Sequence, residues 1–541
     1  MKANIFKKGI KKYKQFVLRH SGQDYKKTRF KDVLSTNLAS KSFVDVQASV
    51  PSHLFVNTEY WGVYNIREKI NKHYINNNYG VDEIDLLKGK NTVEEGNSKR
   101  YKELLNFFSN SNLSLASEYN HAISLMDHRN FANFWIYQIY FGNQDVRGNI
   151  RYWRSDSLDG RFRWILYDTD LGWFNSSSSL LFDIIFTNNI KWYNPKWSTF
   201  LLRSLLVNKE FKEYFINQIT FLTSTILSED YVKKEIEELE NKYKPEMIRH
   251  FEDRKKFQNY QGSFNTWQKE VNKLKTFASE RSEILFYQTQ KAFELPSHYN
   301  LKINIENKEK GKVLLNYNEL KSNKFNGRFF SSLDVPIEII SELGYTYLGW
   351  DSKVIKGHNN KDILINISFI KNKESQQKII INEINYKNFC FEIFNQDSTI
   401  VNLNGWKIMD NDKNIHTIEN CMLEKGRFAV FHFNNFDNMI DTVIYNKIDF
   451  KFSSKNKLIA LYDNKGRLVD SVRCDFKSSK NTYSRNIPFN NFYGTQVLWD
   501  NIDSSTIGWH NHQYTKLLDR PSWRLMLDWI SSFLDKSIKK D

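Results

Sequence analysis

The sequence predicts a multidomain α+β protein, in which a mixed helical and strand region precedes two all-β modules. The chain has 541 residues, and at ~150 residues per domain this length suggests three or four domains. Hydrophobic residues make up 40% and aromatic residues 15% of the chain, enough to build several cores, which excludes wholesale disorder. The pattern changes after about residue 293 and again near 378. We therefore expect domains at 1–293, 297–372 and 378–519, followed by an amphipathic tail at 520–541.

Composition excludes several classes of protein. Three cysteines, Cys390, Cys421 and Cys474, are too few for a disulfide framework, and we expect Cys390 and Cys421 to be buried as small apolar residues. No stretch approaches the ~20 apolar residues of a membrane-spanning helix. Residues 1–31 carry nine Lys and two Arg against one acid, Asp24, which is typical of a solvated basic face. Without zinc-finger spacing or an RNP-type motif, we expect no specific binding of nucleic acid.

Periodicity within the first region predicts an order of elements. The first is a hairpin over 53–68 that turns at Asn57, Thr58 and Glu59, followed by a helix over 67–79 that ends at Gly80. A helix over 127–141 and a second hairpin, which turns at Asp159 and Gly160, come next. An antiparallel helical subdomain over 199–293 completes the region.

Acids and amides gather around the second predicted hairpin. Asn143, Asp145 and Asn149 lie at or before its first strand, and Asp168 and Asp170 follow its second strand. Because a hairpin brings its outer ends together, these side chains can share one site, and oxygen ligands of this kind suit Mg²⁺, with Mn²⁺ as an alternative. A phosphotransfer site typically has this arrangement: an Asp, an Asn four residues later, and a further Asp after two strands. The competing interpretation is that Asp-x-Asp only caps the following turn.

Four segments together resemble the spore-coat protein H (CotH) family of atypical protein kinases. They are FVLRHSGQD (16–24), LFVNTEYWGVYNIREKINKHYI (54–75), NQDVRGNIRYWR (143–154) and RWILYDTDLGWF (163–174). Each segment is weak alone, but the four in this order are specific, and the resemblance covers about residues 5–293. It implies a remote relative of the protein-kinase fold that uses ATP and Mg²⁺.

The resemblance also implies a role for individual residues. Asp145 matches the catalytic acid and Asn149 the amide on the metal side of the site. Asp168 matches the metal-binding acid, and Asp170 is a supporting ligand. Glu68 matches a Glu on the helix after the GxY strand, where it orients a phosphate-binding Lys; an exposed helix acid is the alternative.

Other matched residues are expected to be structural. Arg19 and Asp24, in the opening segment, are expected to form a pair. Trp153, Trp164 and Trp173 are expected in the core or in the wall of an adenine pocket.

The chain departs from the family at its start. Members carry an Arg-Gly-Asn-Ser element and a Lys-rich strand before the segment at 16–24, and this chain has neither. We therefore expect an N-terminally truncated chain, which also explains the missing signal peptide. Lys88 and the Lys cluster at 7–14 are the candidates to replace the missing lysine.

The C-terminal regions also resemble known modules. Residues 297–372 are similar to small β-repeat modules of bacterial surface proteins, with a buried Trp350. Residues 378–510 look like a lamin-tail domain, an immunoglobulin-like β-sandwich, with Asn395, Gly405 and Trp406 on its motif. Spacing at 523–538 favours a docking helix over one that lies on a membrane surface.

The expected function is therefore transfer of the ATP γ-phosphoryl group to Ser or Thr of secreted or surface proteins. Cell-surface or coat components are the expected partners, and the expected location is extracellular or on the cell surface of a bacterium, with the cytoplasm as the alternative. Two other functions stay open: a catalytically inactive pseudokinase adhesin, and a structural surface or coat protein whose acids bind Ca²⁺.

Overall fold

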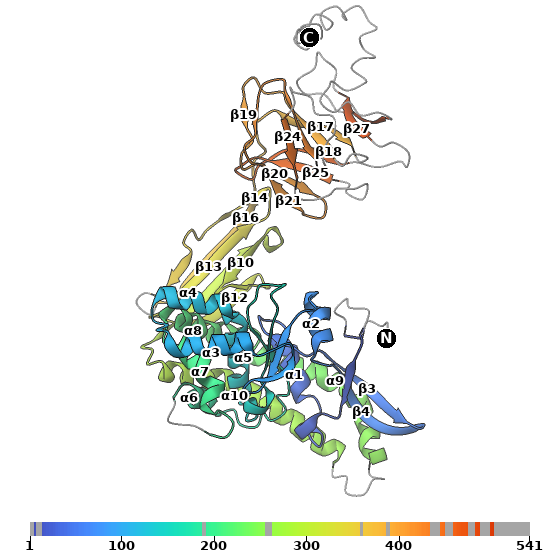
Figure 1. Cartoon of the computed structure of the whole chain (residues 1–541), viewed down its shortest axis with the longest axis vertical. Helices are drawn as coiled ribbons and strands as arrows, with labels where there is room; N and C mark the ends of the chain where they lie inside the picture. The colour runs from blue at the N-terminus through green and yellow to red at the C-terminus, as the bar shows by residue number, and fades with distance from the viewer. Residues whose placement is uncertain are drawn as a thin grey trace, which may run out of the picture. The chain divides into compact units, whose positions relative to one another are not determined.

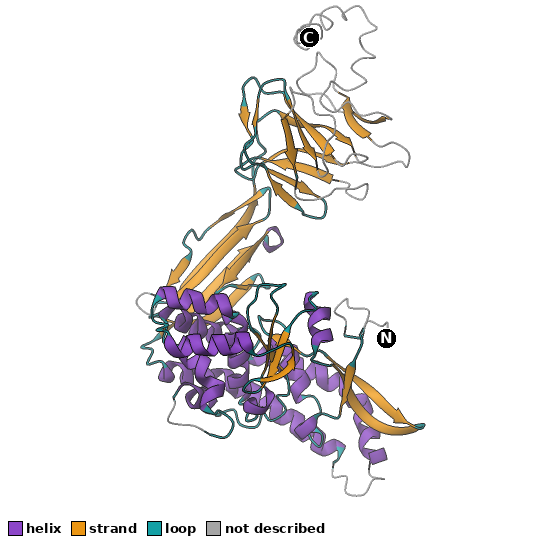
Figure 2. Cartoon of the chain, in the orientation of Figure 1, coloured by secondary structure: helices purple, strands orange, loops and turns teal. Residues whose placement is uncertain are grey.

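A computed structural model describes most of the chain. The described residues are 5–6, 13–186, 191–254, 262–357, 361–385, 390–432, 444–448, 458–473, 482–486 and 498–502. The chain divides into two compact units: the first contains residues 1–304, 313–338 and 350–366, and the second contains 305–312, 339–349 and 367–541. The described α-helices belong to the first unit, and strands occur in both (Figure 2). The predicted multidomain α+β fold class is confirmed, whereas the predicted domain boundaries stay predictions.

A three-stranded antiparallel sheet carries the N-terminal part of the first unit. Its order is β1 (Phe16–Arg19), β4 (Glu59–Glu68) and β3 (Ser49–Val56). The β3–β4 hairpin turns through Asn57 and Thr58, which both have positive φ, so the predicted hairpin is confirmed. Helix α9 (Glu229–Arg254) packs against β4 (Figure 1).

The helix predicted over 67–79 starts later than expected. Arg67 and Glu68 still belong to β4, where they pair with Val17 and Phe16 of β1. Helix α2 (Lys72–Tyr79) begins after Asn71, whose side chain accepts hydrogen bonds from the backbone N–H groups of His73 and Tyr74. It ends at Gly80, which has φ 72°, as the sequence predicts.

A five-stranded sheet positions the candidate site. Its order is β2 (Asp45–Val46), β8 (Arg163–Leu166), β7 (Arg151–Arg154), β5 (Asp85–Lys88) and β6 (Thr92–Glu95). Strands β7 and β8 form the predicted second hairpin. Residues 155–162 connect them as a longer loop instead of the expected tight turn, because the Asp159 carboxylate bonds to the side chains of Arg161 and Arg163 and organises a wider connection.

Helices cover this sheet and make up much of the first unit. Helix α5 (His128–Phe141) is capped by Asp127, ends at Gly142 and contacts β8. Its Phe131 ring lies 4.4 Å from that of Trp164. Trp153, Trp164 and Trp173 are all buried, which confirms that they are core residues. The other helices are α1 (Lys31–Ala39), α3 (Lys99–Asn110), α4 (Ala116–Leu125), α6 (Leu180–Ile185), α7 (Lys196–Leu205), α8 (Lys209–Thr223), α9 (Glu229–Arg254) and α10 (Phe264–Ala292).

Residues 297–372 form β-structure, as predicted, and the two units share them. One four-stranded sheet has the order β11 (Asn318–Glu319), β10 (Gly311–Leu315), β13 (Asp334–Ser341) and β15 (Val354–Lys356). The other has the order β12 (Lys324–Phe330), β9 (His298–Glu306), β16 (Ile363–Lys371) and β14 (Tyr345–Leu348). The prediction of a buried Trp350 is wrong: this residue follows β14 in a loop and is only half-buried.

The second unit contains a β-sandwich core. Strands β17 (Ile379–Asn385), β18 (Cys390–Asn395) and β23 (Phe428–His432) lie side by side in a larger sheet, and β20 (Lys407–Asp410) and β25 (Leu458–Tyr462) pair in another. The remaining strands are β19 (Val401–Asn402), β21 (Ile415–Thr417), β22 (Met422–Leu423), β24 (Ile444–Lys447), β26 (Leu468–Arg473), β27 (Thr482–Asn486) and β28 (Leu498–Ile502).

Motif residues of the predicted lamin-tail domain serve this core. Trp406 is buried in the cluster that contains Phe391 and Leu461. The Asn395 side-chain amide donates to the backbone oxygens of Thr399 at 3.0 Å and Leu423 at 2.8 Å, and Gly405 has φ 78°. Cys390 and Cys421 are buried and free, as predicted. Cys474 and the predicted helix at 523–538 lie outside the described residues.

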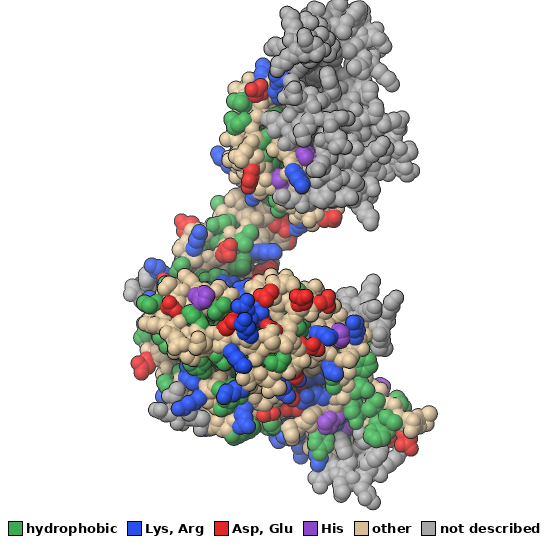
Figure 3. Space-filling view, in the orientation of Figure 1, with side chains coloured by type: hydrophobic (Ala, Val, Ile, Leu, Met, Phe, Trp, Pro, Cys, Tyr) green, Lys and Arg blue, Asp and Glu red, His purple; other side chains and the backbone are tan. Residues whose placement is uncertain are grey.

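Basic and acidic side chains are mixed over the first unit on the face that Figure 3 shows. Within the described part of the chain, none of the helices is both long enough and apolar enough to span a bilayer.

Candidate active site

The two outer ends of the β7–β8 hairpin meet, as the sequence predicts. Asp145 lies before a short 3₁₀ turn (Val146–Asn149), and Asp168 follows β8. The Asn149 side-chain amide donates to Asp145 Oδ2 at 3.0 Å and to the backbone oxygen of Asp168 at 3.2 Å. Asn143 Oδ1 accepts from the Asp145 backbone N–H at 3.1 Å. These contacts hold Asp145, Asn149 and Asp168 in one cluster.

Arg19 at the end of β1 joins this cluster. Its guanidinium Nη2 donates to Asp168 and, at 3.0 Å, to Asp170 Oδ2. The backbone N–H of Gln23 donates to the same Asp170 oxygen at 2.9 Å. The opening segment of the family resemblance therefore forms one wall of the site and compensates the charge of both acids.

The expected pair of Arg19 with Asp24 is wrong. Asp24 is buried, and its carboxylate accepts from the Thr28 backbone N–H at 3.0 Å, the Thr28 hydroxyl at 2.6 Å and the Lys31 backbone N–H at 3.1 Å. These bonds cap the start of α1. The Asp24 side chain faces its own loop because local backbone donors satisfy it there.

The surroundings of Asp145 favour proton uptake. Burial raises the pKa of its carboxyl, the charges of Asp168 and Asp170 raise it further, and the hydrogen bond from Asn149 opposes the change. Asp145 is half-buried, so a ligand can reach it. A carboxylate with a raised pKa in a partly open site is suited to orienting or accepting a hydroxyl proton.

Two backbone features bring the acids close to the loop that carries Arg19. Asp168 has φ 54°, a left-handed conformation that Asp tolerates better than most residues and that recurs at functional sites. Gly22 also has positive φ, and a Cβ placed there would lie 1.9 Å from Asp170 Oδ2. The loop therefore needs glycine at this position in order to approach the carboxylate.

A buried charge network lies behind the acids. Asp32 on α1 accepts from the Thr169 backbone N–H at 3.0 Å and the Thr169 hydroxyl at 3.1 Å, and its other oxygen accepts from Arg67 of β4. Burial lowers the pKa of Arg67 to about 9, and the charge of Arg19 contributes. The Nε and Nη2 atoms of Arg67 are buried without a hydrogen-bond partner. Sequence reasoning missed Asp32 and Arg67, because nothing in their local pattern distinguishes a buried pair from two surface charges.

Glu68 occupies a different element from the one expected. It is the last residue of β4, not a helix residue, and it is 2% exposed. Its carboxylate accepts from the Ala48 backbone N–H at 3.0 Å and from the Asn78 side chain at 3.4 Å. Glu68 thus links β4 to the segment before β3 and to α2. Of the lysines proposed to replace the missing one, Lys88 ends β5, and residues 7–12 lie outside the described residues.

The donors at the site match the chemistry of Mg²⁺. Asp168 and Asp170 offer carboxylates, and Asn149 offers an amide oxygen. Mg²⁺ commonly takes one or two carboxylates and completes its shell with waters and substrate phosphates. Among the described residues, no group of three or more His, Cys, Asp or Glu side chains is placed to hold a metal ion.

Two family models match parts of the chain. The CotH kinase protein family model matches residues 2–285, and the Lamin Tail Domain model matches residues 372–475. A search of curated proteins finds no match.

Among solved structures, the search returns the crystal structure of a DUF4876 family protein from Bacteroides thetaiotaomicron. It is 13% identical, with a TM-score of 0.12 over 26% of this chain and 49% of that chain. The match thus spans about half of that protein's length, and its TM-score is too low to support an argument about the fold. The CotH kinase model, in contrast, covers more than half of the present chain. The chain therefore belongs to the CotH kinase protein family and carries a lamin tail domain in its C-terminal part.

Proposed function

We propose that this protein transfers the γ-phosphoryl group of ATP to Ser or Thr hydroxyls of secreted or cell-surface proteins. The observation that carries the proposal is the hydrogen-bonded cluster of Asp145, Asn149 and Asp168. It lies within the part of the chain that the CotH kinase model matches. The lamin tail domain would then hold the enzyme near its partners at the cell surface or coat.

Asp145 acts on the acceptor in this proposal. Its Oδ2 is held by Asn149, so the carboxylate has a fixed orientation and its other oxygen is available to a hydroxyl group. The raised pKa of Asp145 brings the carboxyl closer to the value that proton acceptance requires. Positioning the hydroxyl in line with the phosphate supplies most of what the protein must contribute.

Asp168, Asp170 and Asn149 would hold Mg²⁺. When bound, the ion neutralises charge on the transferring phosphate. Arg19 bonds to both acids, so binding of the ion would require Arg19 to exchange these bonds for bonds to the phosphates. The Arg19 guanidinium would then place a positive charge beside the phosphates.

A transfer assay tests the proposal. The full chain is incubated with labelled ATP, Mg²⁺ and a Ser/Thr peptide mixture, alongside Asp145→Asn and Asp168→Asn. Each variant should lose transfer by about 100-fold or more, in keeping with the loss of a general base or of charge stabilisation. Asp159→Asn is the matched control, because Asp159 lies in the β7–β8 loop and pairs with Arg163. Transfer that survives both site variants contradicts the proposal.

One observation favours a second candidate, a catalytically inactive scaffold that binds partners through its β modules. The guanidinium of Arg19 bonds to both acids that would hold the metal, as a permanent replacement for a cation would. Nucleotide affinity with and without Mg²⁺ separates the two functions. An inactive scaffold shows no Mg²⁺-dependent binding, and Arg19→Gln does not restore it.

A further inference from the structure

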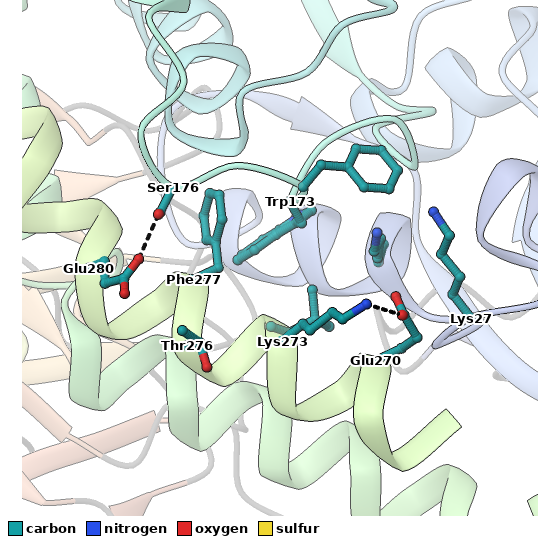
Figure 4. A pocket seen from close by; sticks show the side chains of 11 residues that line it. Lys27, Trp173, Ser176, Glu270, Lys273, Thr276, Phe277 and Glu280 are labelled. Carbon is teal, nitrogen blue, oxygen red and sulfur yellow. Dashed lines mark hydrogen bonds and ion pairs between the residues drawn. The ribbon is translucent and has the colours of Figure 1, made fainter. Parts of the chain in front are cut away.

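A pocket of about 340 Å³ opens beside the segment that follows Asp170 (Figure 4). One side is formed by Trp173, Phe174 and Ser176 of that segment, and another by α10. The start of α1 and the loop before it contribute Lys31 and Lys27. The α10 residues that line the pocket are Glu270, Lys273, Leu274, Thr276, Phe277 and Glu280.

Both acidic side chains of the pocket are already engaged. Glu270 accepts from the Lys273 ammonium at 2.6 Å, and Glu280 accepts from the Ser176 hydroxyl at 2.6 Å. Figure 4 shows these two interactions on opposite sides of the pocket. Neither of these two carboxylates forms an ion pair with Lys27 or Lys31, which also line the pocket.

Lys27 and Lys31 share one aromatic ring. Their ammonium nitrogens lie 4.1 Å and 3.8 Å from the centroid of the Phe174 ring. Lys31 is only 2% exposed, and within the described part of the chain neither ammonium forms a hydrogen bond or an ion pair. Burial lowers the pKa of Lys31, Asp24 opposes this change, the charge of Lys27 adds to it, and Glu270 and Asp170 also oppose it. Two like charges over one ring repel each other, and an anion placed between them would relieve that repulsion.

We propose that this pocket binds a phosphate monoester, presented by an already phosphorylated side chain of the acceptor protein. A phosphate monoester carries a charge of about −1.5 to −2 at neutral pH and three strong acceptor oxygens, which matches two unpaired ammonium groups. Phe174 is 48% exposed, so its ring can contact a peptide.

The pocket lies on the segment that leaves the acid cluster. Its lining residues Trp173 and Phe174 follow Asp170 by three and four positions in the chain, and Asp170 bonds to Arg19. The inference rests on the proposed function, since it supposes that an acceptor protein binds beside the acid cluster.

Calorimetric titration without nucleotide tests the inference. The ligands are a nine-residue peptide with a central phosphoserine, its unphosphorylated counterpart and inorganic phosphate. The proteins are the full wild-type chain, Lys31→Gln, Lys27→Gln and the control Lys26→Gln, whose side chain lies over Tyr25 and does not line the pocket. The phosphopeptide should bind the wild type saturably and at least 10-fold more weakly to the first two variants. Lys26→Gln should leave its affinity unchanged. Lys27 is half-exposed, so its variant keeps the test valid if replacing the buried Lys31 prevents folding.

Several results would overturn the inference. The wild type would show no difference in affinity between the phosphopeptide and its unphosphorylated counterpart, or Lys26→Gln would weaken binding as much as the pocket variants do. Inorganic phosphate would bind as tightly as the phosphopeptide. MgATP would compete with the phosphopeptide, which would assign the pocket to the nucleotide. Phosphate found on Ser176 in the purified protein would also overturn the inference, because a phosphate of the chain itself would then occupy the pocket. Asp168→Asn should bind the phosphopeptide normally, so a failed transfer assay and a failed titration can be told apart.

Discussion

At the scale of single residues, Gly22 is closely enclosed by the acid cluster. An alanine there must adopt φ +54°, and its Cβ would lie 1.9 Å from Asp170 Oδ2 and 2.6 Å from Arg19 Nη2. We expect Gly22→Ala to lower the free energy of unfolding by about 1–3 kcal/mol and to abolish phosphate transfer, as measured by urea denaturation and the transfer assay.

Gly80→Ala is the matched control for this change. Gly80 has φ +72°, and a Cβ there meets nothing within 4 Å, so the backbone is strained but no contact is lost. This variant should be destabilised by about 1 kcal/mol and keep its activity. Equal effects of both variants on transfer would contradict the role given to Gly22.

His128 should make stability depend on pH. Its ring packs near Phe211 and Tyr214, and burial, with help from Arg129, lowers its pKa to about 4. In the unfolded chain the pKa is about 6.5. As pH falls from about 6.5 towards 4, the unfolded state therefore takes up a proton that the folded state does not, and the free energy of unfolding decreases.

His128→Phe should flatten this dependence. Urea unfolding at pH 7, 5.5 and 4.5 measures the slope for the wild type and the variant. His53→Phe is the matched histidine control, since the His53 side chain is 52% exposed. The same slope in His128→Phe as in the wild type would show that this histidine does not couple folding to protons.

Residue types and spacing predicted part of the site. Asp145, Asn149 and Asp168 meet because a hairpin joins them, and hairpins can be predicted from local signals. The partners of Arg19 could not be predicted, because Asp168 and Asp170 lie about 150 residues further along the chain. The buried pair of Arg67 with Asp32 was missed because nothing in the local pattern of either residue distinguishes a buried pair from two surface charges.

At the scale of elements, Arg281 of α10 donates hydrogen bonds to the end of α5 and to residues 176–178. It is fully buried, and its guanidinium donates to the backbone oxygens of Tyr140 at 2.8 Å, Ile139 at 2.6 Å, Ser176 at 2.7 Å and Ser178 at 3.1 Å. Arg281 therefore satisfies the last turn of α5 and holds the segment beside the phosphate pocket.

Arg281→Met should leave these carbonyl groups without their donor. We expect a loss of about 2–4 kcal/mol in the free energy of unfolding, because several buried acceptors lose a charged partner together. Arg328→Met is the control, since Arg328 forms an exposed pair with Glu283 that is worth about 1 kcal/mol or less. A loss for Arg281→Met no larger than for Arg328→Met, in urea denaturation, would contradict this account.

Elements were predicted best where local signals determine them. Asp127 and Gly142 flank α5, and the expected helix differs from it by one residue. The start of α2 was misplaced because Arg67 and Glu68 are good helix formers that pairing with β1 keeps in a strand. Tertiary pairing of this kind leaves no signal in the segment itself.

At the scale of the whole molecule, the two compact units should respond separately to mutation. Trp406 is 1% exposed in the core of the second unit, so Trp406→Ala should cost that unit about 3–5 kcal/mol. Calorimetry should show one transition at a lower temperature and another unchanged. Transfer activity, which the proposal assigns to the first unit, should persist at 25 °C. Loss of both transitions together would contradict the independence of the units.

The left-handed backbone at Asp168 also determines which replacements the chain can survive. Asn and Gly enter this region at little cost, whereas β-branched residues do not. In a saturation library, variants with Asn or Gly at this position should accumulate to wild-type levels but show no phosphate transfer. Variants with Val or Ile should be degraded. Asp168→Asn is thus a well-folded decoy with which natural targets can be captured and held from cell extracts.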